Sequence, residues 1–263
     1  MTTHHPTALI TGASSGIGSE LAHVFAEHGY NLVLVARRES KLQQLASDLQ
    51  SKHRTTSWIF PIDLFNPNSP DELHKKITVN GLTVDVLVNN AGIGTYGKFT
   101  ETDLECELQL MQLNIVTLTH LTKLIARDML SRGSGKILNV ASTAAFQPGP
   151  LMAVYYASKA YVVSFSNALA AELNGTGVSV TVLCPGPTAT EFQEKAKMNN
   201  VRLFSRILVM DARAVAEAGF HGLMKGKMIV IPGIINKTLV QIQRFVPRKF
   251  PILVAKFLQE GRQ

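Results

Sequence analysis

The 263 residues are enough for one large α/β domain, and we expect a single domain over residues 1–263. The composition, 46% hydrophobic and 17% charged, excludes disordered and collagen-like proteins. The net charge of +7 is uneven: residues 195–263 hold 13 basic and 3 acidic side chains, whereas residues 1–194 hold 13 and 16. A solvated face, a phosphate-bearing substrate or an anionic surface such as a membrane would account for this basic last third.

Several other classes of protein are disfavoured by what the sequence lacks. No basic segment precedes an apolar stretch near the N-terminus, so we expect a cytoplasmic protein without a signal peptide. The longest uncharged run, Ile137–Ser158, is interrupted by Asn139 and Pro148 and does not resemble a membrane span. Cys106 and Cys184 are not spaced as metal ligands or as a redox pair, so we expect no bound metal. We also expect no nucleic-acid partner.

Short β-branched runs alternate with helical patterns along the chain. The run Leu32–Val35 is apolar on both faces, which is typical of a parallel sheet covered by helices on both sides. The segments Ile17–His28 and Glu39–Leu49 place leucines at helical spacing. We therefore expect an α/β, Rossmann-type doubly wound fold with ligands at the carboxyl ends of its strands. The seven predicted strands are Ala8–Thr11, Asn31–Ala36, Thr56–Ile62, Val84–Asn89, Gly135–Ala141, Val178–Cys184 and Met228–Pro232.

A glycine-rich loop, Thr11–Gly18, follows the first predicted strand and opens the first predicted helix. Its three glycines permit a tight turn, close approach of the backbone to a pyrophosphate and close helix packing. The anion would lie at the positive N-terminus of the helix. A plain turn is the alternative, but the location between strand and helix favours a nucleotide. The residues expected to hold it are Gly12, Ser14, Ser15, Gly16, Ile17 and Gly18.

The end of the second predicted strand indicates which nucleotide binds. The chain has Ala36-Arg37-Arg38 where an NAD-binding protein would carry a carboxylate for the ribose 2′-OH. Arg37 is placed to bind the 2′-phosphate of NADP(H), with Ser14 and Arg38 as possible helpers. The alternative is that these arginines only begin a solvated helix. This alternative is stronger for Arg38 than for Arg37.

Tyr155 and Lys159 are four residues apart and would share one face of a helix. We expect the lysine ammonium to favour the tyrosinate and to lower the pKa of Tyr155 toward a range useful for acid–base catalysis. Tyr156 has no lysine at the same offset. Ser142 ends a predicted strand, and its hydroxyl could bond the same substrate oxygen that Tyr155 protonates. The three residues therefore predict proton transfer at a carbonyl oxygen.

In order and spacing, these residues resemble the short-chain dehydrogenase/reductase family over nearly the whole chain. The resemblance implies an NADP(H)-dependent oxidoreductase that reduces a carbonyl or oxidises the corresponding alcohol. The glycine loop lacks the Lys or Arg that many NADP-preferring members carry, so Arg37 would supply most of the preference. The motifs that carry the resemblance are Thr11–Gly18, Asp63, Asn89–Gly92, Asn114, Ser142, Tyr155-x-x-x-Lys159, Pro185-Gly186 and Thr188.

The resemblance also implies roles that the spacings do not show. Asn114 would position a water joining Lys159 to solvent, and Lys159 would bond the nicotinamide ribose. Thr188 would hold the nicotinamide amide. The structural alternatives are a turn for Asp63, a buried amide for Asn90 and a helix-bending residue for Asn114. Beyond the glycine loop and the two arginines, the cofactor residues would be Asp63, Leu64, Asn90, Ala91, Gly92, Tyr155, Lys159, Pro185, Gly186 and Thr188.

The substrate is expected to be an apolar small molecule or acyl compound with a carbonyl or alcohol group, covered by about residues 187–210. The apolar residues that suggest this could equally be core or subunit contacts. A non-catalytic NADPH-binding regulator is the alternative function, which the intact Ser142, Tyr155 and Lys159 disfavour. The apolar residues expected in this cover are Phe192, Met198, Val201, Leu203 and Phe204, and those expected in the pocket walls are Tyr96, Phe146 and Met152.

The last residues, about 238–263, interleave apolar and basic side chains. This composition suits interfacial helices, which Pro247 and Pro251 would keep short. We expect either contact with an anionic membrane surface or an acidic partner, or packing on the protein's own domain or a second subunit. The resemblance implies a homodimer or homotetramer.

Overall fold

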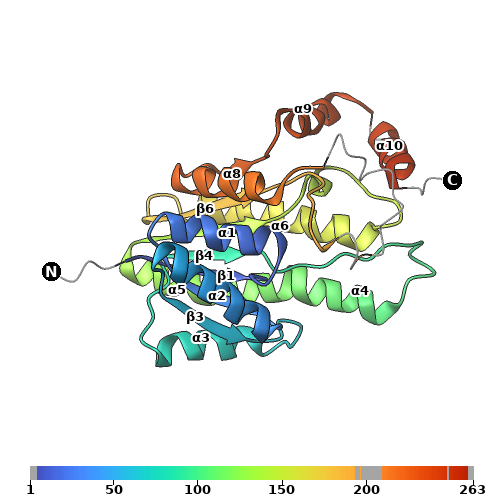
Figure 1. The fold of residues 1–263 in the computed structure, drawn as a ribbon. Coiled ribbons are helices and arrows are strands. Elements are labelled where there is room, and N and C mark those ends of the chain that lie inside the picture. The colour runs from blue at the N-terminus through green and yellow to red at the C-terminus, as the bar shows by residue number, and fades with distance from the viewer. Residues whose placement is uncertain (1–4, 193–195, 197–208, 248, 260–263) are drawn as a thin grey trace.

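The computed structural model describes residues 5–192, 196, 209–247 and 249–259. Its centre is a seven-stranded sheet in the order β3-β2-β1-β4-β5-β6-β7, with every neighbouring pair parallel (Figure 1). The chain crosses from one half of the sheet to the other between β3 and β4, which creates the switch point expected of a doubly wound fold. The strands are β1 (Thr7–Thr11), β2 (Asn31–Ala36), β3 (Ser57–Pro61), β4 (Val86–Asn89), β5 (Gly135–Val140), β6 (Val178–Leu183) and β7 (Ile229–Val230).

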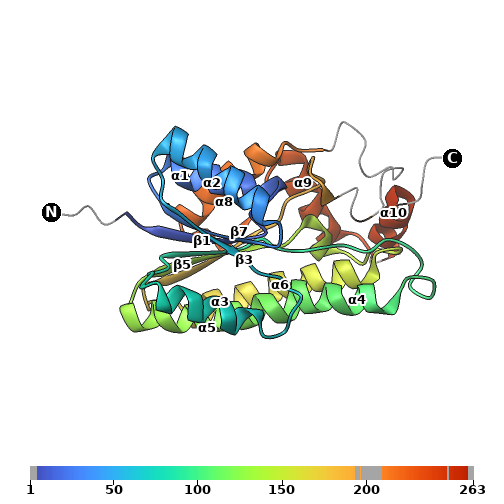
Figure 2. The ribbon, with the colours of Figure 1, turned by 60° about the horizontal axis from the view of Figure 1, so that its bottom comes forward.

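Helices cover both faces of the sheet, as Figure 2 shows. One face carries α1 (Gly16–Glu27), α2 (Glu39–His53) and α8 (Ala212–Met224). The other carries α3 (Ser69–Val79), α5 (Leu118–Arg132) and α6 (Ala153–Glu172). On that second face α4 (Leu104–Met111) continues through the π-helix η1 (Gln112–Thr117) into α5. A 3₁₀ turn, η2 (Thr143–Phe146), precedes α6.

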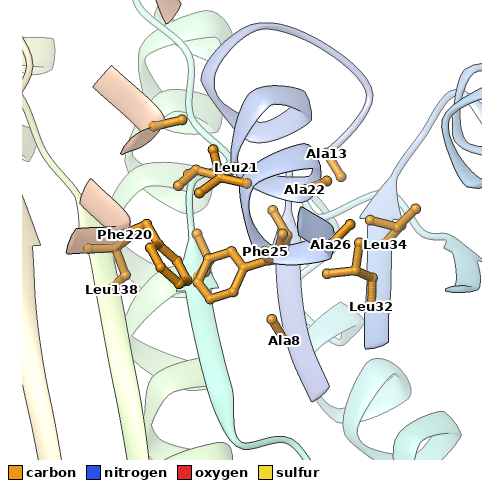
Figure 3. Packing of buried hydrophobic residues seen from close by; sticks show 14 of the residues in the cluster. Ala8, Ala13, Leu21, Ala22, Phe25, Ala26, Leu32, Leu34, Leu138 and Phe220 are labelled. Carbon is orange, nitrogen blue, oxygen red and sulfur yellow. The ribbon is translucent and has the colours of Figure 1, made fainter. Parts of the chain in front are cut away.

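Alternate residues of the strands enter two separate cores. Leu32 and Leu34 of β2 face the α1 side, whereas Val33 faces the opposite side, because successive strand side chains point in opposite directions. On the α1 side, the rings of Phe25 and Phe220 meet edge to face with their centroids 5.0 Å apart (Figure 3). This two-sided burial explains why the strands are almost entirely apolar.

The predicted fold class and all seven parallel strands are confirmed, and the errors are at strand ends. β7 is only two residues long where five were predicted, and β4 begins at Val86 rather than Val84. β5 and β6 each end one residue early, and β3 lacks the first and last predicted residues. Of the residues at these ends, only Ile62 after β3 and Ala141 after β5 line the cleft described below.

A buried polar network joins the middle of the sheet to the second helical face. The Asn89 amide donates to Thr122 Oγ1 and to Asn139 Oδ1, both at 2.8 Å. The Asn139 amide donates to Ser166 Oγ at 2.9 Å. All four side chains are at most 3% exposed. The network therefore ties β4, β5, α5 and α6 together.

The C-terminal part forms α9 (Ile234–Ile242), a 3₁₀ turn η4 (Gln243–Phe245) and α10 (Lys249–Gln259). The predicted short helical pieces are thus confirmed within the described residues. Pro247 precedes α10, and Pro251 lies in its first turn, where no intrahelical N–H bond is lost. Among the described helices, none is long and apolar enough to cross a membrane.

Candidate active site

A cleft of about 380 Å³ lies at the carboxyl ends of the central strands. One end is bordered by Arg37, Arg38 and Asp63, and the other by Ser142 and Tyr155. The residues predicted from sequence that line it are Gly12, Ser14, Ser15, Gly16, Ile17, Arg37, Arg38, Asp63, Leu64, Asn90, Ala91, Gly92, Ser142, Tyr155, Lys159, Pro185, Gly186 and Thr188. Gly18 and Asn114 were predicted as site residues, but they do not line the cleft.

Close backbone packing fixes the position of the glycine loop at the edge of this cleft. Gly12 has φ +66°, and a Cβ there would lie 2.9 Å from the Ala91 Cα. A Cβ on Gly18 would lie 2.3 Å from the Gly12 carbonyl oxygen, so Gly18 supports the loop from behind rather than facing a ligand. The first turn of α1 carries no acidic residue and no side-chain cap. Its backbone N–H groups are therefore suited to an anion.

Thr11 and Asn90 fix the loop against β4. The Asn90 amide donates to the Thr11 carbonyl at 2.9 Å and to the Gly12 carbonyl at 3.3 Å. Thr11 Oγ1 accepts from the backbone N–H groups of Asn90 and Ala91 at 3.0 and 3.1 Å. Asn90 thus serves as a structural amide and also lines the cleft, so the two interpretations weighed for it are compatible.

The two arginines occupy different environments. The Arg37 guanidinium lies over the Phe65 ring, 4.9 Å from its centroid, in a cation–π arrangement. Arg38 donates to Ser14 Oγ at 3.1 Å and forms an ion pair with Glu191 at 3.0 Å. Both side chains of that pair are about 40% exposed, which limits the stability that it contributes. Ser14 and both arginines therefore converge on one end of the cleft.

Tyr155 and Ser142 meet at the other end. The Ser142 hydroxyl is hydrogen-bonded to Tyr155. Burial nevertheless raises the pKa of Tyr155 above its ordinary value, and this outweighs the bond to Ser142. The expectation that Lys159 lowers the pKa of Tyr155 is therefore wrong for this structure. The physical reason is that Lys159 Nζ lies 5.8 Å from the centroid of the Tyr155 ring and donates to the Val140 carbonyl at 3.0 Å instead.

Lys159 is a buried cation. It is 6% exposed, and burial lowers its pKa to about 8. The neighbouring Cys184 thiol is also buried, and burial raises its pKa to about 12. The lysine therefore lies in an apolar surrounding that disfavours its charge at neutral pH, between the cleft and β5.

Asn114 supports the site from outside the cleft. Its amide bonds both backbone groups of Ile93 at 3.0 Å, and Nδ2 donates to Ser158 Oγ at 3.1 Å. Ser158 in turn donates to the Tyr155 carbonyl at 2.7 Å. A Cβ on Gly92 would lie 3.1 Å from Asn114 Oδ1 and 3.3 Å from Lys159 Nζ. Asn114 thus fixes the start of α6 and approaches Lys159, although the side chain makes these protein contacts rather than lining the cleft.

The substrate side of the cleft is apolar. Met152, Phe192 and Tyr156 line it, and the Phe192 ring lies 5.3 Å from that of Tyr155. Tyr96 packs in the same cluster, and Phe146 packs in the core beneath α6. Neither lines the cleft, so the expectation that they form part of the pocket wall is wrong. The other candidates, Met198, Val201, Leu203 and Phe204, lie outside the described residues, as does most of the expected substrate cover.

A match to the family described as short chain dehydrogenase extends over residues 6–200 and includes every motif of the cleft. The chain belongs to the short chain dehydrogenase family. This membership places it among the oxidoreductases.

Three relatives of this short chain dehydrogenase illustrate the range of its similarity. A very-long-chain 3-oxoacyl-CoA reductase of Phaeosphaeria nodorum is 40% identical over 66% of this chain and 52% of the relative. A 17-beta-hydroxysteroid dehydrogenase type 3 of Mus musculus is 37% identical over 70% of this chain and 60% of the relative. A short-chain dehydrogenase from Sphingobium yanoikuyae, solved in complex with NADPH, is 30% identical, with a TM-score of 0.81 over 92% of this chain and 96% of the other. The chain spans about half the length of the first curated relatives that it matches.

Several residues of this short chain dehydrogenase site escape a reading of the sequence. Phe65, whose ring lies beneath Arg37, is two residues after Asp63. Its aromatic side chain was the only feature of the sequence that could have indicated this role. Glu191 and Gln147 had none, because they reach the cleft from loops far along the chain. Ser158 lies next to Lys159 in the catalytic motif, but its bonds to Asn114 and Tyr155 need the fold to be visible. These residues position the site's charged and catalytic groups.

Proposed function

We propose that this protein is an NADPH-dependent reductase of apolar carbonyl compounds, able to oxidise the corresponding alcohols. The observation that carries the proposal is the single cleft that joins an arginine-bordered end to Ser142 and Tyr155. The residues present fit a nicotinamide dinucleotide, because the glycine loop lines the cleft and the N-terminus of α1 offers N–H groups to a pyrophosphate. The relatives named as a very-long-chain 3-oxoacyl-CoA reductase and a 17-beta-hydroxysteroid dehydrogenase support an apolar substrate.

The proposed chemistry follows from the side chains at the far end of the cleft. A bound nicotinamide cofactor supplies or accepts the hydride. Tyr155 donates its proton to the carbonyl oxygen as negative charge develops there, and Ser142 donates a hydrogen bond to the same oxygen. The raised pKa keeps Tyr155 protonated and ready to act as the acid in the reducing direction. Lys159 Nζ, which lies 5.8 Å from the centroid of the Tyr155 ring, would hold the nicotinamide ribose, and Asn114 positions the segment that carries both residues.

A direct test is NADPH consumption by the purified protein with a panel of ketones and aldehydes of increasing apolar size. We expect turnover to increase with apolar substituents because Met152 and Phe192 line the substrate side. Sugars serve as the matched polar controls and should be poor substrates. NADPH binding without consumption across the panel would favour the non-catalytic regulator instead.

Arg37 is expected to set the cofactor preference. A charge-assisted contact with the 2′-phosphate is worth roughly 1.5–3 kcal/mol, or about ten- to one-hundred-fold in affinity. Arg37→Ala should weaken NADPH binding by about that factor and leave NADH binding unchanged, as measured by cofactor fluorescence titration. Arg38→Ala should have a smaller effect because Arg38 is already engaged with Ser14 and Glu191. Equal affinity of the unaltered protein for both cofactors would contradict the assignment.

We further propose that the protein is a homo-oligomer that associates through α4 and η1. Four apolar side chains on this outer surface are 37–68% exposed: Leu104, Leu108, Met111 and Val116. Such a face is suited to the same face of a second copy. The molar mass measured by light scattering should be that of a dimer or larger oligomer for the unaltered protein and that of a monomer for Leu104→Ser/Leu108→Ser. An unaltered protein that is monomeric at micromolar concentration would exclude this proposal.

A further inference from the structure

The C-terminal helices present their apolar side chains to solvent. We name as the C-terminal surface the large apolar residues of α9, η4 and α10 that are each at least 49% exposed. Within so short a stretch of chain, this number of exposed apolar groups indicates a binding surface. Its members are Ile234, Ile235, Leu239, Ile242, Phe245, Phe250, Leu253, Val254 and Phe257.

Helix geometry separates this surface from the side that holds each helix in place. In α10, Phe250, Leu253 and Phe257 recur at helical spacing, whereas only Ala255 and Gln259 are buried. In α9 the buried residues are Asn236 and Val240, and the exposed apolar ones lie on the other sides of the helix. Both helices are therefore anchored along a narrow edge and point their apolar faces away from the core.

The sequence that forms this surface is strongly basic. Residues 234–263 contain one acidic residue, Glu260, and six basic ones, namely Lys237, Arg244, Arg248, Lys249, Lys256 and Arg262. Lys249 and Lys256 are seven residues apart on α10 and adjoin Phe250 and Phe257, so they border the apolar face. Apolar groups bordered by lysines are suited to the boundary between lipid headgroups and acyl chains, where the lysines meet anionic headgroups.

A second copy of the chain is a poorer occupant of the same surface. In a two-fold contact each basic border would face its own equivalent, and like charges would oppose the association. The exposed apolar face of α4 and η1 carries no such concentration of positive charge, since residues 104–117 include no lysine or arginine and Glu105 is exposed among them. The two surfaces therefore differ in the partner that they fit.

The C-terminal surface is also joined to the substrate side of the cleft. Gln259 at the end of α10 donates to the hydroxyl of Tyr156, and its carbonyl accepts from Tyr96 at 2.6 Å. Gln243 in η4 donates to Gln147, a cleft residue, at 2.7 Å. The helix α10 lies at the end of the molecule opposite the N-terminus, and α9 lies between α8 and α10 (Figures 1 and 2). A partner bound at the C-terminal surface would thus lie beside the substrate end of the cleft.

We propose that the C-terminal surface binds the face of a membrane that contains anionic lipid. The aromatic and aliphatic groups enter the headgroup boundary, and the bordering lysines bind lipid phosphates. An apolar substrate dissolved in that membrane would reach the cleft beside α10, and this consequence rests on the proposed reductase function. The binding itself requires neither substrate nor turnover.

The experiment is sedimentation of the full chain with vesicles of phosphatidylcholine alone or mixed with phosphatidylserine. We expect the protein to pellet with the mixed vesicles at low salt and to be released at high salt. Lys249→Gln/Lys256→Gln should lower partitioning by about fivefold per lysine. Phe250→Ser/Phe257→Ser should lower it by roughly tenfold per ring. The matched control Val79→Ser/Leu130→Ser removes exposed apolar side chains from α3 and α5 and should pellet like the unaltered protein.

Three results would overturn the proposal. The first is failure of the unaltered protein to pellet with the mixed vesicles at low salt. The second is equal loss of pelleting in the phenylalanine variant and in the matched control. The third is dissociation of an oligomer by Phe250→Ser/Phe257→Ser in the absence of vesicles, which would assign the surface to a second copy. Circular dichroism checks that each variant is folded, and the carbonyl panel is scored separately, so a failure here leaves the reductase function standing.

Discussion

Replacing Tyr155 by Phe is expected to lower kcat by about a hundred- to ten-thousandfold, because it removes the proton that the carbonyl oxygen receives. The ring remains, so the cleft keeps its shape and cofactor affinity should change little. Steady-state turnover of an active ketone together with a cofactor titration would measure both quantities. The loss should appear in kcat, since the hydroxyl acts as charge develops on the oxygen rather than when the cofactor binds.

Tyr156→Phe is the matched control for this prediction. Tyr156 also lines the cleft, and its ring centroid is 6.1 Å from that of Tyr155, but its hydroxyl bonds Gln259 of α10. Its loss should cost about 1 kcal/mol of stability and leave kcat within about tenfold. Turnover that persists in Tyr155→Phe, or that disappears only in Tyr156→Phe, would show that the wrong tyrosine has been assigned.

Replacing Lys159 by Met is expected to abolish turnover and, at pH 7, to raise the free energy of unfolding. Burial lowers the pKa of Lys159 to about 8, below the ordinary value of 10.5 that applies to the unfolded chain. Below pH 8 the native state therefore holds an unfavourable buried charge. The difference in pKa corresponds to about 3 kcal/mol, and loss of the bond to the Val140 carbonyl offsets about 1 kcal/mol of it. The expected net gain for Lys159→Met is about 2 kcal/mol.

The stability difference between the unaltered protein and Lys159→Met should depend on pH. Between pH 8 and 10.5 the unfolded chain binds the lysine proton and the native state does not, so the unaltered protein gains stability as the pH rises. The advantage of Lys159→Met should therefore shrink across that window. Urea unfolding at pH 7, 8, 9 and 10 measures the difference, with Lys225→Met as the exposed-lysine control. A variant less stable than the unaltered protein at pH 7, or a difference independent of pH, would contradict the buried-cation argument.

The fold could be predicted from the sequence because each strand is apolar on both faces and each is followed by turn residues. Runs such as Leu32–Val35 leave little alternative to a covered parallel sheet. The ends of the strands were predicted less well. At β7, for example, the apolar residues extend beyond the two that pair with β6, because burial of a side chain and pairing of its backbone are different properties.

The candidate site was predictable where function depends on local spacing. The glycine loop and the Tyr155–Lys159 pair lie within single turns or helices, and the structure brings both to one cleft. The pKa of Tyr155 was not predictable in this way, since it depends on burial and on the direction in which Lys159 points. Nor was the ion pair of Arg38 with Glu191, whose partners are 153 residues apart and meet only across the cleft.

The buried amides of Asn89 and Asn139 also have a consequence for the order in which the protein comes apart. The hydrogen bonds of these amides form only while β4, β5, α5 and α6 are packed together. Separating any one of these elements would leave polar groups without hydrogen-bond partners in an apolar interior. The four elements should therefore open as one cooperative unit. Tyr155 and Lys159 lie on α6, so the chemistry is carried by the segment of the chain that resists local unfolding, whereas α10, held by two buried residues, belongs to the part that opens first.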